Sequence, residues 1–397
     1  MIKIEDLFKN KDECCGCELC ANVCPKNVIV MHDDEEGFFY PHIVDQDKCI
    51  DCGLCLNLCP IKSIDKTQSQ FLEFYAGSLV DKKELASCAS GGLATAISKA
   101  IIKDGGIVYG VSYSDNWQGV QYERIISNVS INQLKTSKYV QARKNDIYQQ
   151  IADDLRLGKT VLFIGLPCDV AAVNRKFVNA ASHLFTIELI CHGPTSCKVQ
   201  KQYCEKLEKK YGSKLEFFSM RYKKNGKWLP FYIYATFKNG AKHVELFHSS
   251  IYGASFRYLK RPSCYTCKIK GSKLTGDLMI GDYHYVEKGM PGYDPGGVSV
   301  ALVHTDKGKK LLALCQEAFS IIRIDPQGGL ANGAIHRAFQ VPERRNEFEI
   351  AFVRHGIVKA GKLPFVILST LKRNLKYFIM KMGVKVKRII IPSSGLK

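Results

Sequence analysis

The sequence predicts a small α+β head, a larger α/β domain with an antiparallel β insertion, and a basic helical tail. Two cysteine runs of identical spacing fall within residues 14–60. From residue 71 onward, apolar runs of strand length alternate with helical patterns, and residues 351–397 contain 11 basic and no acidic side chains. A chain of 397 residues is long enough for two or three domains. We expect a head over residues 1–66, a body over 71–345 and a tail over 350–397.

Both cysteine runs read Cys-x2-Cys-x2-Cys-x3-Cys-Pro. This is the spacing of bacterial 4Fe-4S ferredoxins, in which three cysteines of a run hold one cluster and the fourth reaches across to the other. The head is therefore predicted to be a ferredoxin-like module with two 4Fe-4S clusters. One cluster is expected on Cys14, Cys17, Cys20 and Cys59, and the other on Cys49, Cys52, Cys55 and Cys24.

Zinc and disulfides are the alternatives for these cysteines. Structural zinc sites use pairs of close ligands rather than triplets followed by Cys-Pro, and disulfides need an oxidising compartment. The N-terminus lacks a basic segment followed by an apolar run, so no signal peptide is expected and the predicted compartment is the cytoplasm. Cys15 is spare in the pattern. We expect it to be a bystander, although it leaves open which of the adjacent pair binds iron.

Charge is unevenly distributed along the chain, whose formal net charge is +19. Residues 1–66 hold 13 acidic and 7 basic side chains, which makes the head acidic and the remainder basic. This asymmetry predicts either docking of the head on the body or an acidic substrate or cofactor in the body. Nucleic acid is another partner of basic proteins, but the sequence contains no nucleic-acid-binding motif, so we do not expect it.

The body begins with a predicted strand over residues 71–80 and a predicted helix over 93–102, joined through Ser90-Gly91-Gly92. A glycine pair that opens a helix lets a phosphate approach the backbone amides at its positive end. A plain tight turn is the commoner role of such a pair. Further on, residues 215–247 alternate aromatic and polar side chains around two Asn-Gly dipeptides, which indicates an antiparallel β insertion.

A second group of cysteines lies in the body. Cys168 and Cys191 follow predicted buried strands over 160–164 and 184–190, where an open α/β sheet places its ligand crevice. Cys264 and Cys267 form a Cys-x2-Cys pair. Four thiolates are enough for a third cluster, and a zinc site or ordinary buried cysteines are the alternatives. Asp169, His192, Asp282 and His284 adjoin these turns, but hydrogen-bonded structural roles are commoner and no catalytic residue is assigned.

The tail carries apolar residues at helical spacing over residues 363–382, interspersed with lysine and arginine. This pattern predicts a basic amphipathic helix. Peripheral contact with the inner face of an anionic membrane is one interpretation. A terminal helix packed on its own domain is the other. No apolar run is long enough to span a bilayer.

Several motifs together resemble those of the beta subunits of coenzyme F420-reducing hydrogenases and dehydrogenases. The similarity runs from the head to about residue 345. Its carriers are residues 87–92 (SCASGG), 137–141 (SKYVQ), 165–168 (GLPC), 191–194 (CHGP), 261–267 (RPSCYTC) and 280–283 (IGDY).

The resemblance implies an FAD-binding α/β domain that carries its own iron-sulfur cluster. By position, Ser90, Gly91 and Gly92 would lie on the FAD phosphates, and Lys138, Tyr139 and Gln141 near the flavin ring. Cys168, Cys191, Cys264 and Cys267 would hold a third 4Fe-4S cluster. The family usually has tryptophan after the Gly-Asp-Tyr motif, whereas this chain has His284.

We therefore expect an FAD- and iron-sulfur-dependent oxidoreductase that passes electrons between clusters, FAD and an organic acceptor. Its expected partners are a redox partner protein or low-potential electron donor, and an anionic small-molecule acceptor. The resemblance leaves the acceptor open between coenzyme F420 and a polysaccharide-pathway intermediate. The alternative is an electron-relay subunit that feeds a partner enzyme and performs no substrate chemistry. A third interpretation is a protein that binds a membrane surface through its basic tail.

Overall fold

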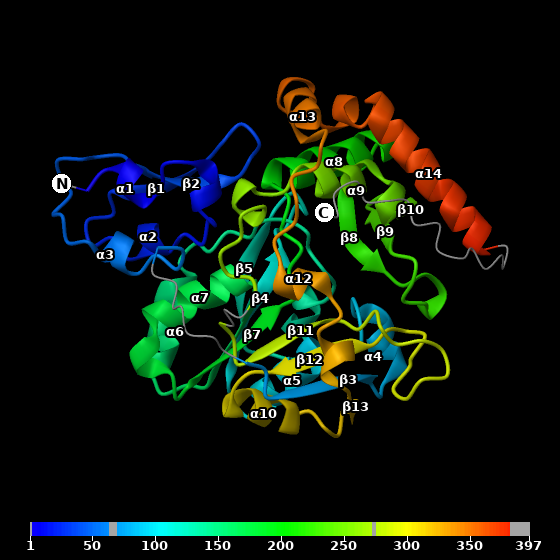
Figure 1. Ribbon diagram of the computed structural model, residues 1–397, viewed down its shortest axis with the longest axis horizontal. Coiled ribbons are helices and arrows are strands. Elements are labelled where there is room, and N and C mark those ends of the chain that lie inside the picture. Colours follow the sequence, from blue (N-terminus) through cyan, green and yellow to red (C-terminus); the bar gives the residue numbers. More distant parts are fainter. Residues whose placement is uncertain (1, 63–69, 272–274, 382–397) are drawn as a thin grey trace.

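The computed structural model describes residues 2–62, 70–271 and 275–381. Figure 1 shows the N-terminal head at one end of the molecule and the last helix, α14, at the other. None of the helices in these described ranges has the length and apolar content needed to cross a membrane.

The head is built from short elements around the two cysteine runs. Strands β1 (Ile29–Asp33) and β2 (Phe39–Ile43) pair antiparallel, with Ile29 opposite Ile43. The remaining head elements are α1 (Ile4–Leu7), η1 (Lys11–Glu13), α2 (Leu19–Asn22) and α3 (Leu54–Asn57). Residues 63–69, between the head and the body, lie outside the described residues.

The body is organised by a mixed sheet of eight strands in the order β13-β3-β12-β11-β7-β6-β4-β5. Its centre, β4-β6-β7-β11, is parallel, and β5, β12, β3 and β13 run antiparallel to their neighbours. The strands are β3 (Glu73–Leu79), β4 (Ile107–Tyr113), β5 (Val120–Ile125), β6 (Val161–Gly165), β7 (Leu184–Leu189), β11 (Leu278–Asp282), β12 (Ser299–Val303) and β13 (Phe319–Arg323).

Helices cover both faces of this sheet, because adjacent strand residues point to opposite sides. Val108 and Leu162 face one layer with α5 and α10, whereas Tyr109 and Phe163 face the other with α6 and α7. The helices of the body around the sheet are α4 (Lys82–Ser87), α5 (Leu93–Lys103), α6 (Ile147–Arg156), α7 (Pro167–Lys176), α10 (Asp306–Ala313), α11 (Pro326–Gly329) and α12 (Gly333–His336). Short 3-10 turns are η2 (Ser130–Leu134), η3 (Val178–Ala180) and η6 (Pro262–Cys264).

The predicted β insertion is a three-stranded antiparallel sheet in the order β10-β9-β8. It comprises β8 (Leu215–Tyr222), β9 (Tyr232–Phe237) and β10 (Lys242–Leu246), with η4 (Lys224–Gly226) and η5 (Phe247–Ser249) at its turns. Helices α8 (Cys197–Tyr211), α9 (Ile251–Tyr258) and α13 (Arg345–Ala360) pack together beside it.

The end of the chain is divided differently from the expected boundary at residue 350. Helix α13 crosses that position and buries Phe348 and Phe352 in the core shared with α8 and α9. Its apolar side chains therefore belong to the body. The predicted amphipathic helix is α14 (Pro364–Lys381), which follows after a break at residues 361–363.

Candidate iron-sulfur and flavin site

The two cysteine runs adopt the same backbone path. Gly16 and Asp51 occupy equivalent positions of the two runs and have φ values of +68° and +56°. Glu18 and Gly53, two residues further on, have φ values of +61° and +72°. These left-handed residues turn the chain twice within each run. As a result, the first three thiols of a run can face one space.

The thiols of the head line two small cavities. The first head cavity, of about 30 Å³, is lined by Cys14, Cys15, Cys17, Cys20 and Cys59. The second head cavity, of about 20 Å³, is lined by Cys24, Cys49, Cys52 and Cys55. In each cavity the fourth predicted cysteine comes from the other run. This is the crossed arrangement that the ferredoxin spacing predicts.

A third thiol-lined cavity, the body cavity, has a volume of about 60 Å³ and lies at the carboxyl ends of β6 and β7. Cys168 is the second residue of α7, directly after β6, and Cys191 follows β7. Gly193 has a φ of +85°, and a Cβ there would lie 2.9 Å from the Cβ of Cys264. Only glycine therefore allows this close approach of the two segments. The structure brings Cys168, Cys191, Cys264 and Cys267 to the body cavity, together with Cys15.

The body-cavity thiols are spread around a space rather than aimed at a point. Within residues 2–62, 70–271 and 275–381, no three Cys, His, Asp or Glu side chains converge closely enough to hold one metal ion. A structural zinc ion needs all its sulfur ligands about 2.3 Å from one centre. A cubane is bound by thiolates at separate iron atoms. The four predicted thiol ligands of the body cavity are enough in number for one cubane.

Burial makes the thiolate form of these cysteines costly without a nearby cation. It raises the pKa of Cys191 to about 11, although the ammonium of Lys270 opposes the rise. Burial likewise raises the pKa of Cys264, where Cys191 adds a like charge. Lys270 is held in place by donating to the backbone oxygens of Cys191 and Ala334. Positively charged iron would supply the missing compensation.

Cys15 was expected to be a bystander, and the structure gives it a more specific position. It lines both the first head cavity and the body cavity. It therefore lies on the same cavity as Cys168. The adjacent Cys14-Cys15 pair was the signal in the sequence, but spacing alone does not show which way the second thiol points.

The largest of these cavities, which we call the flavin cavity, measures about 300 Å³ and opens at the N-terminus of α5. Ser90 and Gly92 line it, and Gly92 is the N-cap of the helix with a φ of +85°. Gly91 lies behind them, because a Cβ at that residue would meet the backbone oxygen of Gly77 at 2.3 Å. This close-packed turn exposes the first amides of an 11-residue helix, which suits a phosphate group.

Lys138 and Tyr139, which the resemblance would place near a flavin ring, also line this cavity. Burial lowers the pKa of Lys138 to about 7. Its ammonium donates to the backbone oxygens of Gln133 and Lys135, at 2.9 Å each. These two backbone oxygens hold the side chain in place, and no carboxylate of the described residues contacts its ammonium group. The pKa of Lys138 therefore stays near neutrality.

A charged pair forms another wall of the flavin cavity. Arg221 donates two hydrogen bonds to the carboxylate of Asp282, at 2.9 and 3.1 Å, and a third at 3.0 Å to the Tyr139 hydroxyl. Burial alone would raise the pKa of Asp282, but Arg221 lowers it below its usual range. His284 lies 3.5 Å from the same carboxylate and stacks on Trp228 with a centroid distance of 5.0 Å. The carboxylate thus stays charged and fixes its neighbours.

Gln141, expected near the flavin ring, does not line the flavin cavity. It lies between the head and the body, where its amide nitrogen donates to the Gly16 oxygen at 3.2 Å. Its side-chain oxygen accepts a hydrogen bond from Arg261 at 2.9 Å. The residue before it, Val140, bridges to Thr195, so the chain turns away from Tyr139 toward the head. Gln141 is therefore a docking residue, and this corrects the expected placement.

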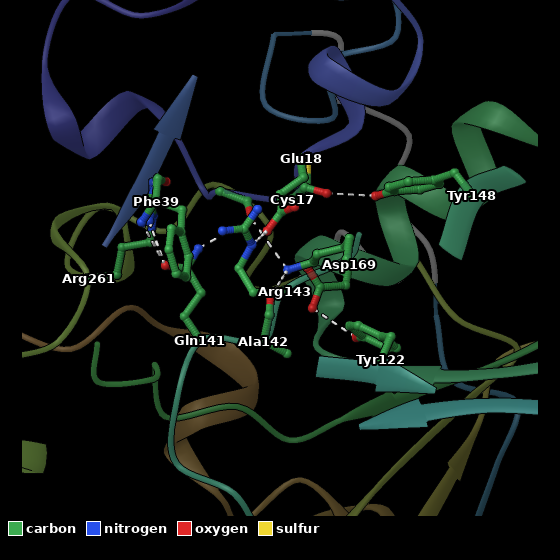
Figure 2. A network of polar contacts seen from close by, with 12 residues as sticks. Cys17, Glu18, Phe39, Tyr122, Gln141, Ala142, Arg143, Tyr148, Asp169 and Arg261 are labelled. Carbon is green, nitrogen blue, oxygen red and sulfur yellow. Dashed lines mark hydrogen bonds and ion pairs between the residues drawn. The ribbon is translucent and has the colours of Figure 1, made fainter. Parts of the chain in front are cut away.

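Arg261 is the centre of the head-body contact shown in Figure 2. This residue is 1% exposed. Its guanidinium donates to the backbone oxygens of Cys14 at 2.8 Å and Phe39 at 3.0 Å, in addition to Gln141. One side chain of the body thus binds two separate segments of the head.

A second set of polar contacts continues this interface (Figure 2). Lys144 binds the Gly16 oxygen at 3.3 Å and the Asp169 carboxylate at 2.9 Å. Burial would lower the pKa of Lys144, but the carboxylates of Asp169 and Glu18 raise it above its ordinary value. Tyr148 donates to the Cys17 oxygen at 2.8 Å. The acidic head is therefore docked on the basic body, as the charge asymmetry predicted.

Three of the four cavities share lining residues. The first head cavity and the body cavity share Cys15 and Ile61. The body cavity and the flavin cavity share the segment of residues 191–194. The first head cavity, the body cavity and the flavin cavity therefore adjoin in that order, whereas the second head cavity has its own lining residues within the head. Groups bound in the three adjoining cavities would form one row.

Comparison with known proteins agrees with this geometry. Residues 158–326 match the family described as the C terminus of the coenzyme F420 hydrogenase/dehydrogenase beta subunit. Residues 13–63 match the 4Fe-4S dicluster domain. The central part of the chain, residues 158–326, therefore carries the C-terminal domain of this beta subunit family. The first match spans β6, β7 and the β insertion, and it includes all four predicted ligands of the body cavity.

The other comparisons are more distant. No curated protein matches the chain. Among solved structures, the chain is similar to one from the F420-reducing [NiFe] hydrogenase complex of Methanosarcina barkeri, at 16% sequence identity and a TM-score of 0.46. The match covers 76% of this chain and 93% of that one. Together, the two family matches show an iron-sulfur electron-transfer protein whose body is similar to the F420 hydrogenase/dehydrogenase beta subunits.

Proposed function

We propose that the protein is an iron-sulfur flavoprotein oxidoreductase that passes electrons between 4Fe-4S clusters, FAD and an anionic organic acceptor. The observation that carries this proposal is the row formed by the first head cavity, the body cavity and the flavin cavity, of which the first two are lined by thiols. Neighbouring redox groups must lie close together for electrons to pass, and shared walls meet that need. The twelve predicted cysteines would hold three clusters, four to each.

The flavin cavity has the chemistry that FAD requires. Its volume of about 300 Å³ lies within the range of small-molecule sites. The N-terminus of α5 offers amides to the pyrophosphate, through Ser90 and Gly92. Lys138 and Tyr139 would lie beside the ring. When bound, FAD would accept single electrons from clusters and deliver a hydride to an organic acceptor.

The residues of this chain would prepare the site for such chemistry. Arg221 and Asp282 fix each other and the Tyr139 hydroxyl, so the wall facing the ring is held rigid. Lys138 and Arg221 favour an anionic acceptor. Coenzyme F420, which carries a phosphate, and a phosphorylated polysaccharide-pathway intermediate both meet this description. Reduction assays with each would separate them.

Anaerobic purification followed by iron, sulfide and flavin quantitation tests the proposal. We expect about twelve irons per chain, because three cubanes carry four each, and one FAD. Iron and sulfide without flavin would overturn the enzyme assignment and leave the alternative, an electron-relay subunit that feeds a partner enzyme. Reduction of F420 or another organic acceptor by the flavin-loaded protein would exclude the pure relay.

The pH dependence of FAD binding should report on Lys138. Because its pKa is about 7, the side chain is charged below neutrality and becomes neutral as the pH rises. FAD is anionic, so its affinity is expected to fall above pH 7 by up to about tenfold per pH unit, the limit for one linked proton. Titrations of the flavin-free protein at pH 6 and 8.5 would measure this.

Lys138→Met should weaken FAD binding at pH 6 and leave the affinity at pH 8.5 nearly unchanged. Lys159→Met, at an exposed position after α6, is the matched control and should keep the pH profile of the unmodified protein. Identical profiles for the Lys138 variant and the unmodified protein would show that another group titrates.

A further inference from the structure

Helix α14 carries an apolar stripe on its exposed side. Ile367, Leu371, Leu375 and Phe378 follow one another at spacings of four and three residues, and Leu368 lies beside them, so all five share one side of the helix. Each of the five side chains is 47–60% exposed. Apolar side chains of this size would normally face the core of a terminal helix.

The side of α14 that faces the body carries different residues. Val366 is buried there, and Phe365 packs edge-on against Tyr258 of α9 at 5.3 Å. Near the other end, the hydroxyl of Tyr377 is 3.0 Å from that of Tyr232 in β9. At 100° per residue, Val366 and Tyr377 lie opposite the apolar stripe. The helix thus points its most apolar side away from the protein.

Charge around the stripe is of one sign. Residues 351–381 include no aspartate or glutamate and seven basic residues. Lys372 and Lys376 follow Leu371 and Leu375 by one residue each, which places them along one border of the stripe. The basic residues of this segment are Arg354, Lys359, Lys362, Lys372, Arg373, Lys376 and Lys381.

We propose that α14 is a peripheral membrane anchor that lies in the surface of an anionic bilayer, with the stripe among the acyl chains and the flanking lysines at the phosphates. An exposed apolar face bordered by basic residues is the arrangement of interfacial helices. Each lysine near an anionic surface adds to binding. A second copy of this chain would bring like charges together, and none of the described helices, α14 included, is long and apolar enough to span the bilayer.

The proposal goes beyond the redox function and does not depend on it. It places the electron-transfer row on a protein that resides at a membrane surface, so a donor or acceptor in the lipid phase becomes accessible. Its failure would leave the clusters and the flavin unaffected.

Vesicle flotation of the full-length protein tests this anchor. We expect binding to vesicles of phosphatidylglycerol mixed with phosphatidylcholine, weaker binding at high salt, and little binding to phosphatidylcholine alone. Leu371→Glu combined with Leu375→Glu should reduce binding at least about tenfold, because two lipid-inserted leucines are lost. Lys372→Gln combined with Lys376→Gln should reduce it about tenfold on the anionic vesicles only.

Val129→Glu combined with Val178→Glu is the matched control. These two valines are 82% and 68% exposed and lie at the starts of η2 and η3, away from α14, so vesicle binding should be unchanged. Iron content and absorbance of each variant report that the body is folded. Equal flotation of the leucine variant and the unmodified protein would overturn the proposal. A dimer would also overturn the proposal if the leucine substitutions dissociated it and neither protein bound vesicles. The stripe would then be a contact surface for a second copy of the chain.

Discussion

Replacement of Cys264 by alanine is expected to remove about four of about twelve irons per chain. The substitution leaves three of the four predicted thiolate ligands of the body cavity, and we expect the cubane there to be lost. Cys264 lines the body cavity, which lies between the first head cavity and the flavin cavity. The variant should therefore keep two reducible clusters in the head while electrons from the head no longer reach the organic acceptor. Iron and sulfide assays, with electron paramagnetic resonance of the dithionite-reduced protein, would measure the cluster number.

Three further cysteine variants sharpen this experiment. Cys315→Ala changes a buried thiol in the core beneath α10, which lines none of the four cavities, and should retain about twelve irons. Cys15→Ala tests the choice between adjacent thiols. We expect it to retain all the iron, whereas Cys14→Ala should lose about four. The opposite result would transfer the ligand role to Cys15, and full iron content in Cys264→Ala would contradict a third cluster at this site.

The sequence was most informative where chemistry imposes spacing. A cubane demands thiolates at short, regular intervals, so eight of the nine cysteines of the head can be grouped into two sets without a structure. The structure brings those two sets to two cavities. The glycine pair before α5 was also readable, because a positive φ and close packing leave few alternatives to glycine.

Sequence reasoning was weakest where residues far apart in the chain meet. Gln141 follows Tyr139 by two residues, yet one faces the head and the other the flavin cavity. The bridge from Val140 to Thr195 fixes that change of direction, and no local pattern encodes it. The same holds for Cys15, which shares the body cavity with Cys168, more than one hundred residues away. The expected tail boundary failed for a related reason, because only tertiary packing shows that α13 belongs to the body.

The polar head-body interface has a consequence for electron transfer. Its contacts fall largely on backbone oxygens of the first cysteine run, at Cys14, Gly16 and Cys17. Because body residues bind these backbone oxygens, they hold the predicted cluster-binding loop at a fixed distance from the body cavity. The hydrogen bonds that dock the head would therefore also set the distance between a cluster in the first head cavity and a group in the body cavity.

Arg261→Met is accordingly expected to loosen the head by on the order of 3 kcal/mol, the range for losing a buried, charged hydrogen-bonding group. Two backbone oxygens of the head and the Gln141 side chain would lose their donor in a buried place. Hydrogen-deuterium exchange of β1 and β2 should become faster, and thermal loss of cluster absorbance should occur at a lower temperature. Electron transfer from the head to the acceptor should slow in parallel.

Arg261→Lys separates the effect of charge from that of geometry. Lysine keeps the positive charge but has no planar fork, so it cannot reach all three acceptors at once. We expect it to recover only part of the lost protection. Arg156→Met is the matched control, since Arg156 is exposed on α6 and bonds only locally to Asp153. Unchanged exchange in the Arg261→Met head would show that Lys144 and Tyr148 suffice for docking, and faster exchange confined to the body would show that Arg261 acts within the body instead.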